Sequence, residues 1–494
     1  TGGMADQVAL YVDSSGDPFV SWTESSSGAP AIYLRGQTFD TGTTYIADGM
    51  PGATIQEILD ANTFAAGDVI LVDEAAAAGF TLSADDANVT ILGAPGSSVS
   101  GLATVAADAA DVVLQRLDLT GGLSIAGGAG IAMLESTVTG GIAVNGGTDV
   151  HLAHNSISGS PALALTLPGA GLLVEWNYFG GAGGLIFNGT AADMLVRGNH
   201  IDPSGTGILF AGTANGTVTG NRITASTTGL DIANAFLGTF DSNTISGAAV
   251  GVQYDAPATL TANRIQGNTT GVVTTVAGTV DGFGFVNPDV PNFIVDNTTG
   301  VSLVGAQVQN QHIHSNTVAV AGTGILGGID LARANLIDEH AVGVQGFTGP
   351  ITYTRIARNG IGVLPGSDQE VFHNLIYDNT THGVVADGVT DVRVFQNTIH
   401  ADGGDALRVE NGSVEVEARG NILWTEAGYT LNVADDSLTG FFSDYNLLHV
   451  SGTGTLAHWV IDFTDLLDWQ LDLDRFDLNS IGYTEVNPAW SLPA

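Results

Sequence analysis

The stretch GILFAGTANGTVTGNRITASTTG, residues 207–229, contains one full period of the repeat that dominates this sequence. Within it lie three short runs rich in Ile, Leu, Val and Thr, which Gly, Asn and Ser separate. Branched aliphatic residues favour strands, and Gly and Asn favour tight turns. Each period therefore predicts three short strands joined by turns.

An Asn in front of a β-prone run marks the repeat along the chain. It recurs every 22 residues from Asn155 to Asn243, and again 20 residues later at Asn263. After an insertion, we assign further positions to the same register: Asn316, Asn335, Asn359, Asn374, Asn397, Asn421 and Asn446. The chain lacks the apolar spacing of three and four residues that a helical array requires. We therefore predict an all-β chain wound as a parallel β-helix, with three short strands and about 22 residues per coil.

The recurrent Asn residues have a structural role in this prediction. We expect each Asn at the corner between the second and third strands, where a left-handed backbone is often needed and Asn tolerates it. Stacked on its equivalents, each amide donates to one neighbour and accepts from the other, which forms an inward ladder. For this reason we do not assign these residues to a ligand site.

The repeat and its flanks resemble the right-handed parallel β-helix (pectin-lyase-like) superfamily, which includes pectate lyases, mannuronan epimerases and many bacterial surface proteins. Residues 53–74, ATIQEILDANTFAAGDVILVDE, look like the start of such domains, where a short amphipathic helix caps the open end. Residues 468–490 are similar to the closing coils of bacterial surface β-helices. The resemblance implies a capped right-handed β-helix over residues 51–450 and closing coils or a cap over 451–494.

Two segments depart from the repeat. Residues 1–50 alternate apolar and polar side chains around the turns SSGDP and SSSGAP, which predicts a small antiparallel β-hairpin extension. A lone hairpin is marginally stable, so we expect it to pack on the β-helix or to belong to a longer precursor. Residues 281–292, DGFGFVNPDVPN, carry two prolines and two aromatic residues and predict a loop that leaves the coils.

Composition limits the partners of this chain. Its 494 residues include 12 basic and 51 acidic side chains, a net charge of −39, and every basic residue is Arg. Nucleic-acid binding needs a basic surface, and membrane insertion needs an apolar run of about 18 residues, so we exclude both. The absence of Cys excludes disulfides and thiolate metal sites. The Asp excess suits a salt-rich or calcium-rich exterior, which favours an extracellular or cell-surface location and calcium as a cofactor.

A polar corner late in the chain is the candidate catalytic site. We take as equivalent inward residues Ile361, Val384, Leu407 and Leu431. The corner two positions earlier then carries Asn359, His382, Asp405 and Tyr429, and Arg408 lies beside it. Since neighbouring coils are about 4.8 Å apart, His382, Asp405, Arg408 and Tyr429 would share one sugar-sized patch. In a lyase or epimerase, His382 or Tyr429 would act as base and acid, and Arg408 would bind the substrate carboxylate. The alternative is a water-exposed polar corner.

Family motifs do not support an enzymatic interpretation. The Tyr-Gly-Phe-Asp-Pro-His-Asp run of the epimerases is missing, and only Ile201, Asp202 and Pro203 match part of it. The Arg-Pro pattern of pectate lyases is missing as well, and no Lys is available as a base.

Metal sites are left open by the sequence. His312 and His314 in QHIH share a strand face and could bind a metal, but no third ligand is evident. The acidic side chains near the end of the chain could bind calcium, although no known calcium loop is present: Asp468, Asp472, Asp474 and Asp477. In both cases a solvated surface is the alternative.

The sequence favours an extracellular structural, adhesive or assembly-forming β-helix module of a large bacterial surface or secreted protein. Its partner would then be an extracellular glycan or like subunits. One alternative is a polysaccharide lyase or epimerase that acts on an anionic glycan, and another is a non-catalytic glycan-binding module. The arrangement of His382, Asp405, Arg408 and Tyr429 discriminates between them, because an enzyme needs these side chains to converge on a groove.

Overall fold

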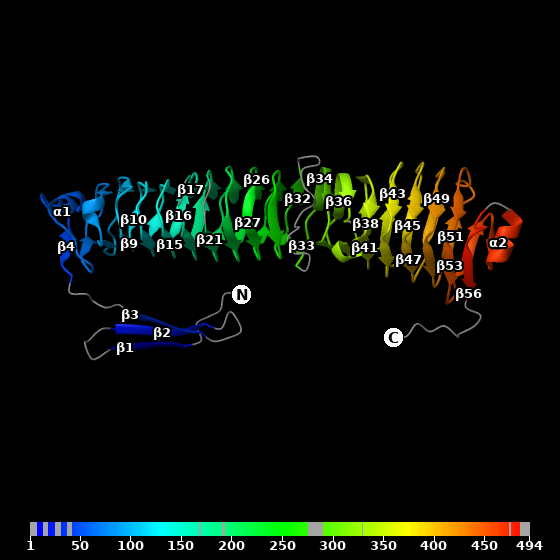
Figure 1. Ribbon diagram of the computed structural model, residues 1–494, viewed down its shortest axis with the longest axis horizontal. Coiled ribbons are helices and arrows are strands. Elements are labelled where there is room, and N and C mark those ends of the chain that lie inside the picture. Colours follow the sequence, from blue (N-terminus) through cyan, green and yellow to red (C-terminus); the bar gives the residue numbers. More distant parts are fainter. Residues whose placement is uncertain are drawn as a thin grey trace.

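A computed structural model of the chain describes residues 7–12, 18–24, 31–36, 42–166, 169–189, 193–274, 290–328, 330–473 and 476–484. Stacked coils form a long rod between helix α1 (Ile55–Ala61) and helix α2 (Leu466–Leu473) (Figure 1). The predicted all-β parallel β-helix is confirmed, because strands of one coil pair in parallel with the equivalent strands of the next.

One coil shows how the repeat folds. It consists of β24 (Gly216–Thr219), β25 (Arg222–Thr224) and β26 (Thr228–Ile232). These strands pair with β27 (Phe236–Asp241), β28 (Thr244–Ser246) and β29 (Val250–Tyr254) of the next coil. Alternation turns Val218, Ile223 and Leu230 inward, and all three are fully buried. Stacking of such side chains from coil to coil forms one continuous apolar core.

Four sheets cover the rod over the described residues. A 17-stranded sheet runs from β10 (Asp118–Leu119) to β56 (Ile481–Thr484). An 11-stranded sheet runs from β4 (Thr44–Ala47) to β30 (Ala258–Thr261), and a seven-stranded sheet from β38 (Val342–Gln345) to β55 (Ile461–Phe463). A further sheet takes in strands from β6 (Thr81–Leu82) to β52 (Phe442–Asp444).

Two long strands join the halves of the rod. The first, β34 (Thr299–Val308), pairs with β32 (Thr270–Thr274) at its start and with β36 (Val318–Leu326) along its length. The end of β36 pairs with β40 (Ile351–Thr352). Both long strands belong to the sheet that contains β6 and β52, and the buried core continues through the coils on either side of them.

The predicted Asn ladder is present and has a direction. The Nδ2 of Asn221 donates to Oδ1 of Asn243, 2.9 Å away, and Oδ1 of Asn221 accepts from Nδ2 of Asn199, 3.0 Å away. We call the stacked residues the first Asn column, which contains Ser136, Asn155, Asn177, Asn199, Asn221, Asn243, Asn263, Asn292, Gln311, Asn335, Thr354, Asn374, Asn397, Asn421, Asn446 and Ser480. Asp477 accepts from the side chains of the last two, Asn446 and Ser480.

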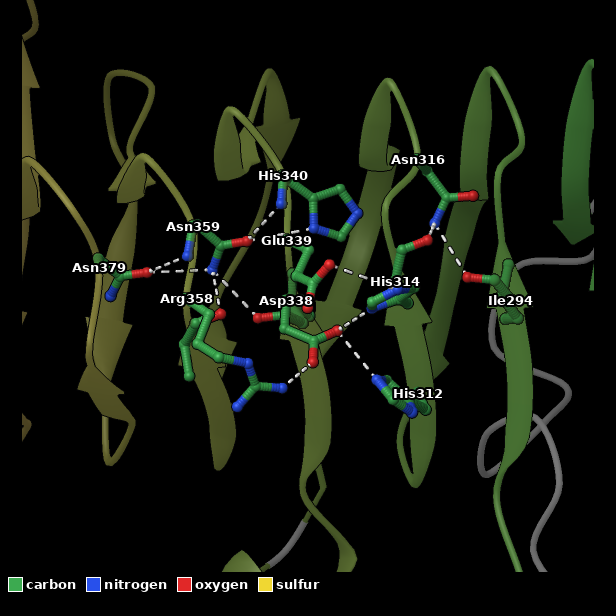
Figure 2. A network of polar contacts seen from close by, with 12 residues as sticks. Ile294, His312, His314, Asn316, Asp338, Glu339, His340, Arg358, Asn359 and Asn379 are labelled. Carbon is green, nitrogen blue, oxygen red and sulfur yellow. Dashed lines mark hydrogen bonds and ion pairs between the residues drawn. The ribbon is translucent and has the colours of Figure 1, made fainter.

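Two details of the ladder prediction are wrong. Asn316 and Asn359 do not belong to the first Asn column. They lie in a second Asn column, at the opposite end of the strands of the 17-stranded sheet, together with Asn268, Asn297, His340 and Asn379. Figure 2 shows Asn316, His340, Asn359 and Asn379 of this column. The left-handed residue at the corner is also not the Asn itself but the residue before it, such as Trp176 (φ 55°) or Tyr445 (φ 59°).

Both ends of the rod are covered. Helix α1 stands where the sequence predicts a cap, and it buries Ile55, Ile58 and Leu59 against the first coils. Thr54 and Glu57 form a capping box at its first turn. At the other end, Trp469 of α2 is fully buried. Its ring lies 5.2 Å from that of Phe463 and 5.8 Å from that of Phe476.

The N-terminal extension contains one strand more than the predicted hairpin. Strands β1 (Gln7–Val12), β2 (Pro18–Glu24) and β3 (Ala31–Gly36) form an antiparallel sheet.

Of the predicted loop, residues 281–289 lie outside the described residues, and Asn292 belongs to β33 (Asn292–Val295). Within the part of the chain that is described, no helix has the length and apolar character that crossing a membrane requires.

Candidate functional site

Strands β45 (His382–Asp387), β48 (Leu407–Glu410) and β51 (Tyr429–Val433) carry the predicted site. They are neighbours in the seven-stranded sheet. Val384 pairs with Leu407, and Leu407 with Leu431, which aligns the corners of three coils as predicted. One coil earlier the prediction fails by two residues, because Ile361 pairs with His382 and not with Val384. Asn359 therefore lies outside this site.

Asp405 is the centre of the site, and its side chain is only 5% exposed. Its Oδ2 accepts from Nη1 of Arg408 at 3.1 Å and from Nδ2 of Asn432 at 2.9 Å. Its Oδ1 accepts from the backbone N–H of Tyr429 at 2.9 Å. We call Asp405, His382, Arg408 and Asn432 the Asp405 cluster. His382, Asp405 and Arg408 were predicted to lie together, and Asn432 joins them.

The protonation of His382 follows from its contacts. Its Nδ1 accepts from the backbone N–H of Asp405 at 3.1 Å. Burial lowers the pKa of His382, and the positive charge of Arg408 lowers it further against the opposing effect of Asp405. The neutral ring then carries its proton on Nε2. His382 therefore presents a donor to the surface, and its one lone pair is already in use.

Tyr429 directs its phenol away from the Asp405 cluster. Its hydroxyl donates to Oδ1 of Asp462, 3.1 Å away, and Nδ1 of His458 lies 2.7 Å from the same oxygen. Burial raises the pKa of Tyr429, and the carboxylate of Asp462 raises it further. The structure thus joins His382, Asp405 and Arg408 and places the Tyr429 hydroxyl in a separate contact.

A hollow of about 470 Å³ lies beside the Asp405 cluster. It is lined by Arg408, Glu410, Asn411, Asn432, Ala434, Asp435, Asp436 and His458. Arg408 already donates from Nε to Glu410 at 2.7 Å. Because carboxylates outnumber cations here, an anionic sugar would need an additional cation to bind in this hollow.

A second hollow of about 470 Å³ was not predicted from the sequence. It is lined by Glu370, Arg393, Phe395, Gln396, Glu417, Arg419, Gly420 and Tyr445, and we call it the Arg–aromatic hollow. Its residues come from β43 (Glu370–Phe372), β46 (Arg393–Phe395) and β49 (Glu417–Arg419), and from the corners after β46, β49 and β52. Alternation turns the first and third residue of each strand outward.

Rings and charges face each other in the Arg–aromatic hollow. The ring of Phe395 is stacked on that of Phe372 at 4.8 Å, with an interplanar angle of 4°. The guanidinium of Arg419 lies over the ring of Tyr445, 4.9 Å from its centre. Arg393 lies 3.4 Å from Glu370. A signal for this site was visible in EVFHN, RVFQN and EARGN, where a charged residue stands four positions before an Asn of the first column.

The residues that could bind a metal differ from those expected near the C-terminus. Asp477 is fully buried and accepts from Nε1 of Trp469 at 2.9 Å and Nδ2 of Asn446 at 3.1 Å, so it closes the first Asn column. Asp474 lies outside the described residues. Among those described, two groups of His and Asp have converging ligand atoms: His312, His314 and Asp338, and Asp378, His400 and Asp402.

Comparison with known proteins bears on the fold. A family model described as "Right handed beta helix region" matches residues 119–287, 183–334 and 292–439. No curated protein sequence matches the chain.

Two solved structures match the chain at low sequence identity. The A-module of mannuronan C-5 epimerase AlgE6 from Azotobacter vinelandii is 13% identical, with 85% of this chain and 91% of that module covered and a TM-score of 0.20. The A-module of mannuronan C-5 epimerase AlgE4 from the same organism is also 13% identical, with 84% of this chain and 91% of that module covered and a TM-score of 0.15. The family match spans more than half of the residues, and it agrees with the coils described above. The chain therefore belongs to the right-handed β-helix family.

Proposed function

We propose that this chain is an extracellular β-helix module that binds a neutral glycan in the Arg–aromatic hollow, which is the adhesive form of the role expected from the sequence. The observation that carries the proposal is the combination of flat rings, paired charges and a volume of about 470 Å³ on one sheet face. Sugars pack their apolar C–H faces against aromatic rings, and their hydroxyls form hydrogen bonds with carboxylates, amides and guanidinium groups.

Charge in the hollow supports a neutral ligand. Two Arg and two Glu side chains line it, so their formal charges cancel in a protein whose net charge is −39. The four residues are placed on paired strands, which hold a binding surface more rigidly than loops do. A neutral sugar therefore meets polar groups in fixed positions without charge repulsion.

The test is binding of oligosaccharides to the whole chain by calorimetry, with a neutral xylo-oligosaccharide and with oligogalacturonate. Tyr445→Ala and Arg419→Ala are each expected to weaken binding of the neutral oligosaccharide about tenfold, a loss of about 1.4 kcal/mol. Trp176→Ala is the matched control, since Trp176 and Tyr445 are both 52% exposed and both stand one residue before an Asn of the first column. The proposal is refuted if Tyr445→Ala and Arg419→Ala bind the neutral oligosaccharide as tightly as Trp176→Ala does.

A second candidate function is polysaccharide lyase or epimerase activity on an anionic glycan at the Asp405 cluster. The convergence of His382, Arg408 and Asn432 on Asp405 beside a hollow favours it. Incubation with alginate and pectin, with and without calcium, would show a lyase by absorbance of the unsaturated product and an epimerase by proton NMR of the polymer. Arg408→Ala should abolish either signal. Assembly with like subunits stays a prediction, which sedimentation at high concentration checks.

A further inference from the structure

A compact group of imidazoles and a carboxylate lies on the outer face of the 17-stranded sheet, away from both hollows described above. His312 and His314 project from β35 (Gln311–His314), and Asp338 ends the neighbouring strand β37 (Asn335–Asp338). Figure 2 shows both imidazole rings directed at the same carboxylate oxygen. Nε2 of His312 and Nδ1 of His314 each lie 2.9 Å from Oδ1 of Asp338.

The surroundings hold these three side chains in place. The side chain of Asp338 is 1% exposed, whereas those of His312 and His314 are 28% and 22% exposed. The ring of Phe293, on the coil before, lies 4.7 Å from the His312 ring and 5.3 Å from the His314 ring. The carboxylate is therefore fixed inside, while the rings leave one side of the group open to solvent.

Further residues orient the ligand atoms. Arg358 donates to the other oxygen, Oδ2, of Asp338, which leaves Oδ1 directed at the imidazoles. Without a metal, Nε2 of His312 and Nδ1 of His314 donate to Oδ1 of Asp338, so an ion must displace these two protons when it binds. Nε2 of His314 lies 3.7 Å from a carboxylate oxygen of Glu339, which can hold a proton on Nε2 once Nδ1 has lost its own. Carboxylate contacts of this kind fix the tautomer of metal-binding histidines in known sites.

We propose that His312 Nε2, His314 Nδ1 and Asp338 Oδ1 bind one zinc ion. Zinc prefers imidazole and carboxylate ligands in a tetrahedron, with bonds of about 2.0 to 2.2 Å. Ligand atoms at these bond lengths are roughly 3.3 Å apart. The two present distances from nitrogen to oxygen, 2.9 Å, are a few tenths of an ångström shorter than this, and all three ligand atoms lie within 4.8 Å of one another.

A fourth position remains for water. The partly exposed rings leave room for it, and a hollow of about 250 Å³ lined in part by His312, Leu336 and Arg355 gives an ion a route from solvent. Three protein ligands with one open position are typical of zinc sites that bind a further molecule. Calcium is disfavoured, because it takes six to eight oxygen ligands and no imidazole.

The experiment is calorimetric titration of the whole chain, stripped with a chelator, with zinc chloride and separately with calcium chloride. We expect one zinc ion per chain, and at least about tenfold weaker binding in His312→Gln and in Asp338→Asn. His400→Gln is the matched control, because His400 belongs to the other His–Asp group, whose two carboxylates are exposed. Far-UV circular dichroism of each variant establishes that it is folded. If Asp338→Asn does not fold, zinc binding is compared between the wild-type chain, His312→Gln and the double variant His312→Gln/His314→Gln.

A second measurement reports the geometry of the site. Cobalt in place of zinc should give the intense visible absorption of a tetrahedral ion, and this absorption should disappear in His312→Gln but persist in His400→Gln. The proposal is overturned if the folded wild-type chain binds no zinc, or if zinc binding survives in the double variant. It is overturned equally if His400→Gln is the change that removes the ion, or if calcium binds the same residues as tightly as zinc.

Discussion

Replacing Asn221 with Ala removes one amide from the first Asn column, and we expect it to lower the free energy of unfolding of that part of the rod by about 3 to 5 kcal/mol. The Oδ1 of Asn221 accepts from the N–H and from Nδ2 of Asn199 at 2.9 and 3.0 Å. Its Nδ2 donates to Asn243 Oδ1 and to the backbone oxygens of Val196 and Thr219 at 2.9, 3.0 and 3.1 Å.

The magnitude follows from what the substitution leaves behind. The buried N–H of Asn199 loses its acceptor, which costs about 1 to 3 kcal/mol. The remaining bonds of the amide contribute about 1 kcal/mol each, and part of that is recovered where the partners have other contacts. Asn145→Ala is the control, since Asn145 is exposed, and its substitution should change stability by no more than about 0.5 kcal/mol.

Amide hydrogen exchange measured by mass spectrometry is the appropriate assay. Coils contact mainly their neighbours, so a global unfolding curve would average a local effect over the whole rod. In Asn221→Ala, peptides that cover residues 194–224 should exchange about 100-fold faster or more, whereas peptides that cover residues 393–423 should be unchanged. Unchanged exchange in residues 194–224 would refute the reasoning that the column stabilises the corner.

Three further predictions concern the ends and the late coils. Trp469→Ala should open the C-terminal end at a cost of about 3 to 5 kcal/mol, seen as a lower Tm and as aggregation by light scattering, whereas exposed Leu467→Ala should do neither. Thr54→Ala removes the capping box of α1 and should cost about 1 kcal/mol in thermal unfolding. Because burial lowers the pKa of His382 from 6.5, the unfolded chain binds its proton first, so stability should fall as pH drops below about 6.5. Urea midpoints at pH 7.5 and 5 should differ less in His382→Gln, and an equal difference would contradict this assignment.

The period of the coils could be predicted from the sequence, but the assignment of Asn residues to columns could not. From Asn263 to Asn379, both ends of the strands of the 17-stranded sheet carry polar residues that bond from coil to coil. Gln311 and Thr354 replace Asn in the first column on just those coils where Asn316 and Asn359 occupy the second. An alignment based on Asn alone therefore assigns Asn316 and Asn359 to the first column, because the spacing along the chain does not reveal that they belong to the second.

The lengths of the coils explain which site residues could be predicted from the sequence and which could not. His382, Asp405 and Tyr429 could be aligned because the coils between them have nearly equal length. Asp338 could not be assigned to His314, because the coil between them contains the extra 3-10 turn Leu331–Arg333. The repeat pattern also does not predict where a side chain points. The hydroxyl of Tyr429 points away from the Asp405 cluster and donates to Asp462.

The direction of the first Asn column determines where coils can be added. Each amide donates toward the next coil, so an amide on the last coil would have hydrogens without an acceptor. Asp477 solves this problem, because a carboxylate accepts from Asn446 and has no N–H to pass on. A duplicated coil inserted between Ser136 and Asp477 would continue the column and lengthen the rod by about 4.8 Å. A coil added after Asp477 would not continue the column, because the Asp477 side chain has no hydrogen to donate to it.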